Sequence, residues 1–434
     1  MFGTRLRSTL VFLCSLLLAA CTQDPAPPTE HSFTVAVIPD TQNYVDFTLQ
    51  KSAGFPLDSS TLFIQQMEYI AGKGVNSGGD IVFVASVGDV WQHVFSKSDP
   101  EHVNRGIFAV PSEMGFDLLI RPDETQNIEI PKAIEGYQLI SQAGIPFGVA
   151  PGNHDYDAWW AAAIAGADTS TGELPPEQLQ VHIGGLDAFR SAFGSDTLFF
   201  RNKDWYISAF DGGSSSAQIF TAGGYRFLHL AFEMQAGDAV LAWAQDVLDA
   251  NPGLPTLITT HDFLNPRGER LPYANMNLAL VDPGHNNSSE QIWEKFIRQN
   301  DQILMVLSGH QLGQALRIDD NAFGHKVYQL LADYQGRGQV GLDAGAEREA
   351  DGPITGIGDG WYREMTFYLG AEHPRVEVKT YSTHYQHYAG ELNTYAQWYR
   401  PQEQPAMSDA EFLQADEFVL DLDDFYSRFG QPVP

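Results

Sequence analysis

The 434-residue chain is poor in cysteine and in basic residues. Its two cysteines, Cys14 and Cys21, lie near the N-terminus, so the rest of the chain offers no disulfide and no thiolate metal site. Lysine and arginine total 25 against 55 aspartates and glutamates, and the net charge is −30. Such an acidic surface repels nucleic acid, so we expect no binding to a nucleic-acid duplex. A site for phosphorylated substrates would need a local positive centre, which a metal ion supplies.

Long hydrophobic runs and internal repeats are also absent, apart from one apolar run near the N-terminus. That run, residues 10–20, follows Arg5 and Arg7, is short for a membrane span, and ends in the sequence LAAC at Cys21. It predicts a lipoprotein signal peptide over residues 1–20 with lipidation of Cys21. Ordinary signal cleavage, with Cys21 incidental, is the alternative. The lack of repeats argues against a structural lipoprotein or adhesin.

The residues after Cys21 predict where the mature protein lies. Residues 21–32 are polar and rich in proline, which is typical of a flexible tether. Thr22, rather than aspartate, follows the cysteine. By resemblance to lipoprotein sorting, this favours the outer membrane or its periplasmic face in a Gram-negative bacterium. We therefore expect an exported protein whose membrane partner is reached through the lipid anchor.

From residue 33 onward, apolar runs alternate with helical patterns, which indicates an α/β fold. The apolar runs are residues 33–38, 81–87, 145–150, 254–260 and 303–307. Helices are predicted near residues 60–72, 131–142 and 237–250 and from residue 289, and a hairpin near residues 365–378. We expect one domain over residues 33–390, with insertions at about 95–130 and 156–225 and a C-terminal tail, 391–434, of uncertain structure.

Each of the five apolar runs ends in polar residues. Open α/β sheets bind ligands beyond the carboxyl ends of their strands, so these residues are expected to converge. Any one of them could be a turn former, but five together are hard to ascribe to folding alone. Carboxylate, amide and imidazole groups suit one or two divalent metal ions such as Mn, Fe, Zn or Mg. The candidates are Asp40 and Gln42, Asp89, Asn153 and His154, His261, and His310.

The order of these motifs (D-x-Q, GD, GNHD, H, GH) resembles the calcineurin-like metallophosphoesterase superfamily over roughly residues 33–385. The stretches VIPDTQ and LLADY-Q are similar to a bacterial exported branch of it, with D-x-Q as first motif. The resemblance implies a four-layer α/β sandwich of two facing mixed β-sheets flanked by helices. It also implies a phosphatase or phosphodiesterase in which metal-bound hydroxide attacks phosphorus in line.

The same resemblance implies a role for each matching residue. Asp40 would bind the first metal, and Asp89 would bridge both metals. The second metal would be held by Asn153, His261 and His310. His154 would be the catalytic residue that protonates the leaving oxygen or stabilises the transition state.

Two departures from the family pattern concern the first metal. Gln42 stands where the family has histidine, and Leu312 stands where the last motif has its second histidine. We therefore expect unequal metal affinity, with the second site tighter; Gln311 or Gln314 could compensate at the first. A non-catalytic, metal- or phosphate-binding surface lipoprotein on the same fold is the alternative function.

The sequence gives weaker evidence for the residues that would contact a phosphoester substrate. Tyr156, Trp159 and Trp160 follow His154 closely and could stack on a substrate group, or could simply pack the segment after the motif. The chain has few arginines, so those near the later motifs are candidate phosphate clamps. The alternative is that they form surface contacts or ion pairs. The four are Arg267, Arg270, Arg317 and Arg363.

Overall fold

A computed structural model describes most of the chain beyond the tether. The described residues are 32–95, 97, 99–105, 119–163, 179–271, 277–282, 284–347 and 356–431. The predicted signal peptide and Cys21, and most of the tether, lie outside this part. Within it, none of the helices has both the length and the apolar character that a membrane crossing requires.

The first sheet has seven strands, which come from the early part of the described chain (β1–β3) and from its late part (β13–β16). Its parallel strands β1, β2 and β3 lie at one side, and β13 runs antiparallel to β1. The strand order is β15 (His387–Tyr388), β14 (Arg375–Ser382), β13 (Trp361–Tyr368), β1 (Ser32–Ile38), β2 (Ile81–Ser86) and β3 (Phe147–Val149), with β16 (Phe418–Asp421) also paired with β14.

The second sheet also has seven strands and is mixed. Strands β8, β9, β10 and β12 are parallel, while β11, β7 and β6 are antiparallel to their neighbours. Its order is β11 (Gly313–Asp320), β12 (Lys326–Asp333), β10 (Ile303–Ser308), β9 (Thr256–Thr260), β8 (Tyr225–Phe232), β7 (Ser215–Ala222) and β6 (Tyr206–Phe210).

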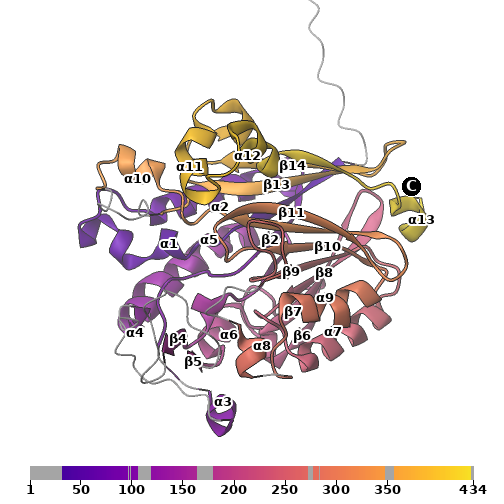
Figure 1. Ribbon diagram of the computed structural model, residues 1–434, viewed down its shortest axis with the longest axis horizontal. Coiled ribbons are helices and arrows are strands. Elements are labelled where there is room, and N and C mark those ends of the chain that lie inside the picture. Colours follow the sequence, from indigo (N-terminus) through magenta and orange to yellow (C-terminus); the bar gives the residue numbers. More distant parts are fainter. Residues whose placement is uncertain are drawn as a thin grey trace, which may run out of the picture.

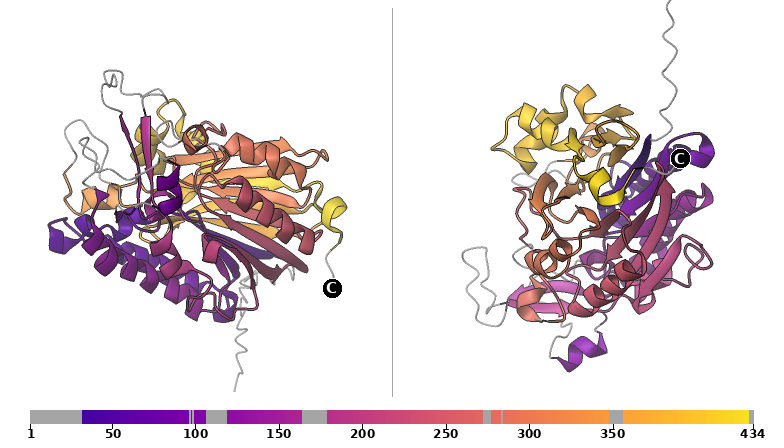
Figure 2. Two further views of the ribbon diagram at one scale, coloured as in Figure 1. Left: turned by 90° about the horizontal axis from the view of Figure 1, so that it is seen from below. Right: turned by 90° about the vertical axis from the view of Figure 1, so that its right-hand side faces the viewer.

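The two sheets face each other, and helices cover their outer sides (Figures 1 and 2). One buried cluster, which includes Phe33 and Phe83 from the first sheet and Phe227 from the second, fills the space between them. Helices α2 (Ser60–Gly72) and α5 (Ile130–Gln142) pack on the first sheet, and α7 (Asp238–Ala250) and α9 (Ser289–Lys295) on the second. The predicted fold class, two facing mixed sheets flanked by helices, is confirmed.

The helices form where the sequence periodicity places them. In α2, the apolar residues Phe63, Met67 and Ile70 recur on one face and are all fully buried. In α9, Ser288 and Gln291 form the capping box that their spacing predicts, with Ser288 Oγ accepting from the Gln291 backbone N–H at 3.3 Å. Shorter helices include α1 (Gln42–Val45), α3 (Pro100–Asn104), α4 (Pro122–Glu124), α6 (Asp187–Phe193), α8 (Leu278–Val281) and α10 (Gln339–Asp343).

The region expected as an insertion over residues 156–225 differs from that expectation. A two-stranded hairpin, β4 (Trp159–Ala163) and β5 (Leu179–Ile183), stands apart from both sheets. Strands β6 and β7, however, belong to the second sheet. The serine- and glycine-rich stretch before Ala217 suggests turns by composition, yet Ser215 and Ser216 are buried strand residues. Residues 106–118 of the other expected insertion lie outside the described part.

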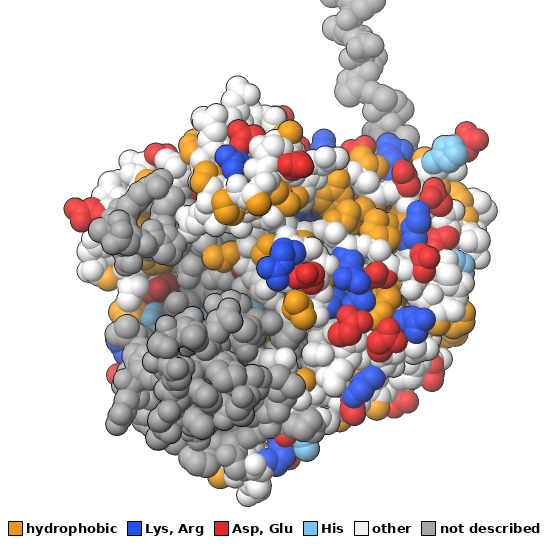
Figure 3. Space-filling view, viewed as in Figure 1, with side chains coloured by type: hydrophobic (Ala, Val, Ile, Leu, Met, Phe, Trp, Pro, Cys, Tyr) orange, Lys and Arg blue, Asp and Glu red, His pale blue; other side chains and the backbone are white. Residues whose placement is uncertain are grey.

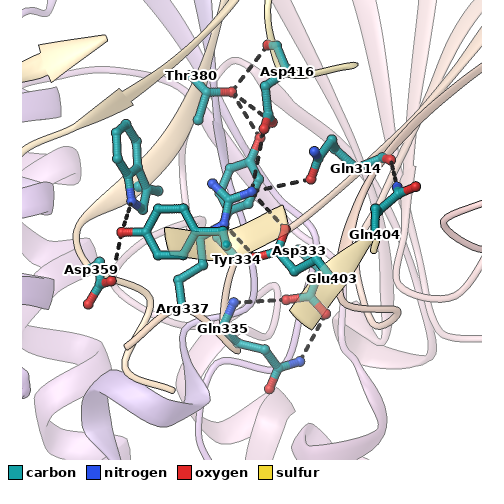
Figure 4. A network of polar contacts seen from close by, with 12 residues as sticks. Gln314, Asp333, Tyr334, Gln335, Arg337, Asp359, Thr380, Glu403, Gln404 and Asp416 are labelled. Atoms are coloured by element: carbon teal, nitrogen blue, oxygen red, sulfur yellow. Dashed lines mark hydrogen bonds and ion pairs between the residues drawn. The ribbon is translucent and has the colours of Figure 1, made fainter. Parts of the chain in front are cut away.

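The C-terminal segment packs against the domain. It contains α11 (Tyr395–Glu403), α12 (Asp409–Asp416), β16 and α13 (Phe425–Phe429). Its contact with the domain centres on Arg337, which is fully buried and ion-paired with Glu403 and Asp416 (Figure 4). The guanidinium also lies 4.0 Å from the ring centre of Tyr334. These contacts of the C-terminal segment therefore hold the loop that follows β12 in place.

Candidate metal centre

The ends of six strands bring the candidate residues together. Asp40 and Gln42 follow β1, and Asp89 follows β2. Three further parallel strands, β3, β9 and β10, lead to Asn153 and His154, to His261 and to His310. The sixth is β12, which ends at Asp333 and is followed by Gln335. All the candidates that the five motifs predict lie in one connected set of contacts.

Four side chains form a compact group that we call the second metal position: Asp89, Asn153, His261 and His310. From His261 Nε2, the distance is 3.1 Å to Asp89 Oδ2 and 3.2 Å each to Asn153 Oδ1 and His310 Nδ1. Ligands bound at about 2.0–2.1 Å to a tetrahedral ion are themselves about 3.3 Å apart. His261 Nδ1 donates to the Val87 carbonyl at 2.9 Å, which turns Nε2 toward the group. These residues therefore fit a divalent ion.

Asp89 connects the second metal position with the residues around Gln42. Its Oδ2 lies near His261 Nε2 and accepts from Gln42 Nε2 at 3.1 Å, and its Oδ1 accepts from the His154 backbone N–H at 2.9 Å. The backbone of Asp89 has φ 51°, in the left-handed region, and Gly88 before it has φ 105°. A Cβ at Gly152 would clash with Asp89 Oδ1, so this glycine permits the close approach. The carboxylate is thus placed to bridge two ions.

His154 lies beside this carboxylate and is half-buried. Its ring Nδ1 is 2.5 Å from the carbonyl oxygen of Gln92, a contact in which the N–H donates. That leaves Nε2 as the nitrogen that can exchange a proton with a substrate. The next residue, Asp155, accepts from the backbone N–H groups of Val90 and Gly152 at 2.9 and 2.8 Å. It therefore ties the motif to the loop after β2.

The first metal position lies around Asp40 and Gln42 and includes two residues that the sequence analysis did not assign. Gln335 Nε2 donates to Asp40 Oδ2 and to Asp333 Oδ2, both at 3.0 Å, and Gln335 Oε1 is 2.5 Å from Gln42 Nε2. The same signal that identified the other motifs, a strand followed by an acid and an amide, is present in LLADYQ. Its role was missed because the family pattern assigns none to it.

The electrostatics of the centre favour added positive charge. Asp40, Asp89, Asp155 and Asp333 are buried, and no lysine or arginine of the described residues forms an ion pair with them. Burial, and then repulsion from Asp333, holds the pKa of Asp40 well above its usual range. Burial raises the pKa of Asp333 to about 7 and that of Asp155 to about 8. Burial opposes protonation of His261, but Asp89 and Asp40 outweigh it and raise its pKa to about 10.

The two glutamines proposed as substitutes for the lost histidine point elsewhere. Gln311 Nε2 donates to Asp262 Oδ1 and to the Leu271 carbonyl, and Gln314 Nε2 donates to the Phe412 carbonyl. Leu312 is exposed, at 41% of its surface. Among the described contacts, neither glutamine reaches Asp40, whereas Gln335 does.

The four candidate arginines are all engaged in ion pairs with carboxylates, which is the second of the two readings that their sequence allows. Arg270 and Arg363 are buried as well, and Arg270 also stacks on the ring of Trp293. In these contacts, none of the four arginines binds a residue of the two metal positions. The pairs are Arg267–Glu269, Arg270–Glu290, Arg317–Asp319 and Arg363–Asp416.

Of the three aromatic candidates, only Tyr156 has a described side chain. It is buried and lines a cavity of about 670 Å³, together with Arg105, Arg190 and Glu233. Trp159 and Trp160 begin β4, and the placement of their side chains lies outside the described part. Tyr156 thus packs in the core and also lines this cavity.

Comparisons with known proteins give two similarities. No protein-family profile matches the chain. It is 26% identical over 204 residues to an uncharacterized protein, YvnB, of Bacillus subtilis (strain 168); the match covers 46% of this chain but 13% of that protein's length. Among solved structures, the chain is similar to a dimetal phosphatase from Danio rerio, with 13% identity and a TM-score of 0.39, over 81% of this chain and 96% of the other. Neither similarity assigns a function to this chain.

Proposed function

We propose that the chain is a metal-dependent phosphoester hydrolase, a phosphatase or phosphodiesterase of the calcineurin-like metallophosphoesterase superfamily. One observation carries the proposal. The Asp89 Oδ2 oxygen contacts both Gln42 Nε2 and His261 Nε2, and the backbone N–H of the half-buried His154 donates to Asp89 Oδ1. A carboxylate shared by two ligand groups, next to a histidine that can transfer a proton, is an arrangement that suits metal-assisted hydrolysis at phosphorus.

The chain's own residues account for the chemistry in three parts. Divalent ions, when bound, supply a nucleophilic water near neutral pH and neutralise charge on phosphoryl oxygens. The ligand set holds such ions at the open ends of the strands, where a substrate can reach them. His154 is held by the Gln92 carbonyl with its Nε2 available, so it can donate a proton to the leaving oxygen or stabilise its charge.

A non-catalytic metal- or phosphate-binding protein on the same fold is the second candidate. The loss of both family histidines at the first metal position favours it. The retained His154 disfavours it, because its ring takes no part in either metal position and is held by a backbone carbonyl instead. We therefore place hydrolysis first.

The discriminating experiment is an assay of the purified chain with p-nitrophenyl phosphate and bis-(p-nitrophenyl) phosphate, each with Mn, Fe, Zn and Mg in turn. We expect release of p-nitrophenol with at least one metal and none after chelation. The ratio of the two rates then separates a monoesterase from a diesterase. If metal-loaded protein hydrolyses neither substrate, the binding function takes its place.

We also propose that the protein is exported and attached to a membrane through lipidated Cys21, on the outer membrane or its periplasmic face. The basic residues, apolar run and LAAC sequence of the first 21 residues support this. A nucleic-acid duplex is not an expected partner at a net charge of −30. On the face shown in Figure 3, lysine and arginine side chains are interspersed with acidic ones instead of forming a basic patch.

A further inference from the structure

The first metal position lacks the two imidazoles that the family pattern would place there, yet it is not short of polar groups. Asp40, Gln42, Asp333 and Gln335 meet in one network next to Asp89. Asp333 and Gln335 come from the end of β12, which lies beside β10 in the sheet. Arg337, two residues further on, is ion-paired with Glu403 and Asp416 of the C-terminal helices (Figure 4). These ion pairs hold the loop that carries Gln335 in place.

The hydrogen bonds of Gln335 determine which atom of its amide faces the centre. Both N–H groups of Nε2 are engaged, one by Asp40 Oδ2 and one by Asp333 Oδ2, each at 3.0 Å. Asp333 Oδ1 also accepts from the Gln335 backbone N–H at 3.0 Å. The amide oxygen, Oε1, is therefore turned to the remaining side, where it lies 2.5 Å from the Gln42 amide.

Two buried oxygens of the same group make an independent observation. Asp40 Oδ1 and Gln42 Oε1 have no hydrogen-bond partner among the described residues, although their residues are 1% and 2% exposed. Buried polar atoms are normally paired, and leaving one unpaired costs about 1–3 kcal/mol. A half-turn of the Gln42 amide would bring its oxygen to the side that faces Asp89 and Gln335. Carboxylate and amide oxygens would then surround one point.

We propose that Gln335 is an oxygen ligand of the first metal position, together with Asp40, Gln42 and Asp89, and that Asp333 orients its amide. The position is then built from oxygen alone, whereas the second metal position has two imidazoles. Oxygen ligands suit Mg²⁺ and Mn²⁺, and imidazole suits Zn²⁺ and Fe²⁺. The first metal position is thus suited to a hard cation, and the missing imidazoles change its metal preference instead of only lowering its affinity. This inference rests on the metal dependence in the proposed function.

Metal content and affinity test the inference without recourse to activity. Purified chain is loaded with equimolar Mn²⁺ and Zn²⁺, dialysed, and measured by elemental analysis; Mn²⁺ affinity is measured by calorimetry. We expect one Mn²⁺ and one Zn²⁺ per chain. Gln335→Ala should weaken Mn²⁺ binding at the first position at least tenfold and leave Zn²⁺ in place. Gln339→Ala is the matched control, because its amide binds the exposed Asp343 on the same segment, and it should keep both ions.

Gln335→Glu separates a ligand from a hydrogen-bond bridge. Glutamate has no N–H groups to join Asp40 with Asp333, but it offers an oxygen to a cation. A ligand role predicts that Gln335→Glu keeps two ions per chain. Loss of Mn²⁺ in Gln335→Glu as complete as in Gln335→Ala would overturn the inference, as would unchanged Mn²⁺ affinity in Gln335→Ala. A wild-type chain with a single ion would also overturn it, whereas a chain that binds no metal would remove the proposed function itself.

Discussion

At the scale of single residues, His154 is the group on which catalysis depends most directly in this account. Its ring is held through Nδ1 by the Gln92 carbonyl, and its backbone N–H is bound to Asp89. The two contacts fix the ring next to the metal positions while leaving it half-buried and reachable. Neither contact makes the ring a metal ligand.

His154→Ala should therefore lower turnover of an activated phosphoester by about 10²–10⁴-fold, because a positioned proton donor is lost. The metal content should stay at the wild-type value. Steady-state rates and elemental analysis on the same preparation measure both. His387→Ala is the control, since that histidine is exposed on β15 and bonds only its local backbone. Undiminished turnover in His154→Ala would remove the residue from the mechanism.

Glu129 positions the loop that holds His154. Its buried carboxylate accepts from the backbone N–H groups of Gln92 at 3.2 Å, His93 at 3.0 Å and Phe47 at 3.3 Å, and from the His93 ring at 2.6 Å. Together with Asp46 these side chains form a compact acid–histidine group. Because backbone N–H groups occupy the Glu129 oxygens, we interpret it as a clamp on the loop after β2.

Glu129→Ala should lower the free energy of unfolding by about 3 kcal/mol or more, since it leaves several buried N–H groups without an acceptor. Urea denaturation measures this, and Glu135→Ala, an exposed position on α5, is the control. Turnover should fall as well, because the Gln92 carbonyl loses its fixed place beside His154. Equal denaturation midpoints for the two variants would contradict the clamp.

The candidate site shows what local sequence can reveal about single residues. The candidate residues after the five apolar runs were singled out from sequence, because a polar residue after a buried strand stands out, and the structure brings them together. Gln335 was not, although the acid and the amide that follow β12 repeat the pattern of Asp40 and Gln42, because the family pattern gives no role to that stretch. Its hydrogen bonds to Asp40 and Asp333 appear only in the structure. Gln311 and Gln314 were chosen for nearness in sequence, and the path of β11 carries them away.

At the scale of elements, segments with regularly spaced apolar residues were predicted correctly, whereas segments of mixed polar and apolar composition were not. Helix α2 and the hairpin of β13 and β14 lie where their apolar spacing places them. Strand β7 was missed because its serines suggest turns, whereas in the structure these serines pair with β6 and β8 and are buried. The C-terminal tail was left open. In the structure, α12 buries Phe412, and the ion pair between Asp416 and Arg337, which are far apart in sequence, docks this helix.

The pH dependence of stability at Asp359 tests the packing of the C-terminal helix α11 against the domain. It accepts from Tyr399 Oη at 2.8 Å and from backbone N–H groups at the start of α10, and burial raises its pKa to about 6. An unfolded aspartate ionises near pH 4, roughly, whereas the folded one keeps its proton to about pH 6. The group therefore favours folding fully below pH 4, and this contribution is lost as pH rises to about 6.

Asp359→Asn should remove that dependence. Relative to the variant, the wild type should lose about 3 kcal/mol of unfolding free energy between pH 4 and pH 7, which corresponds to a shift of about two units. Denaturation of both proteins at a series of pH values measures the difference. A constant offset across the series would contradict this, because it would show that the pKa of Asp359 is the same in the folded and unfolded states.

At the scale of the whole molecule, the proposed function makes the acidic chain a surface-attached domain on a polar tether. Cys21→Ser tests the attachment. In a Gram-negative host, the wild type should fractionate with membranes and the variant should appear in the soluble exported fraction, since a lipidated cysteine is the anchor. Identical fractionation of the two would favour ordinary signal cleavage.

The central claim is that the converging strand ends form a metal centre that hydrolyses phosphoesters. Its most direct test is to measure bound metal and the rate of bis-(p-nitrophenyl) phosphate and p-nitrophenyl phosphate hydrolysis on the same sample, as metal is added back to chelated protein. We predict that the rate rises with occupancy and levels off when the metal positions are full. Full occupancy with no hydrolysis of either substrate would contradict the claim.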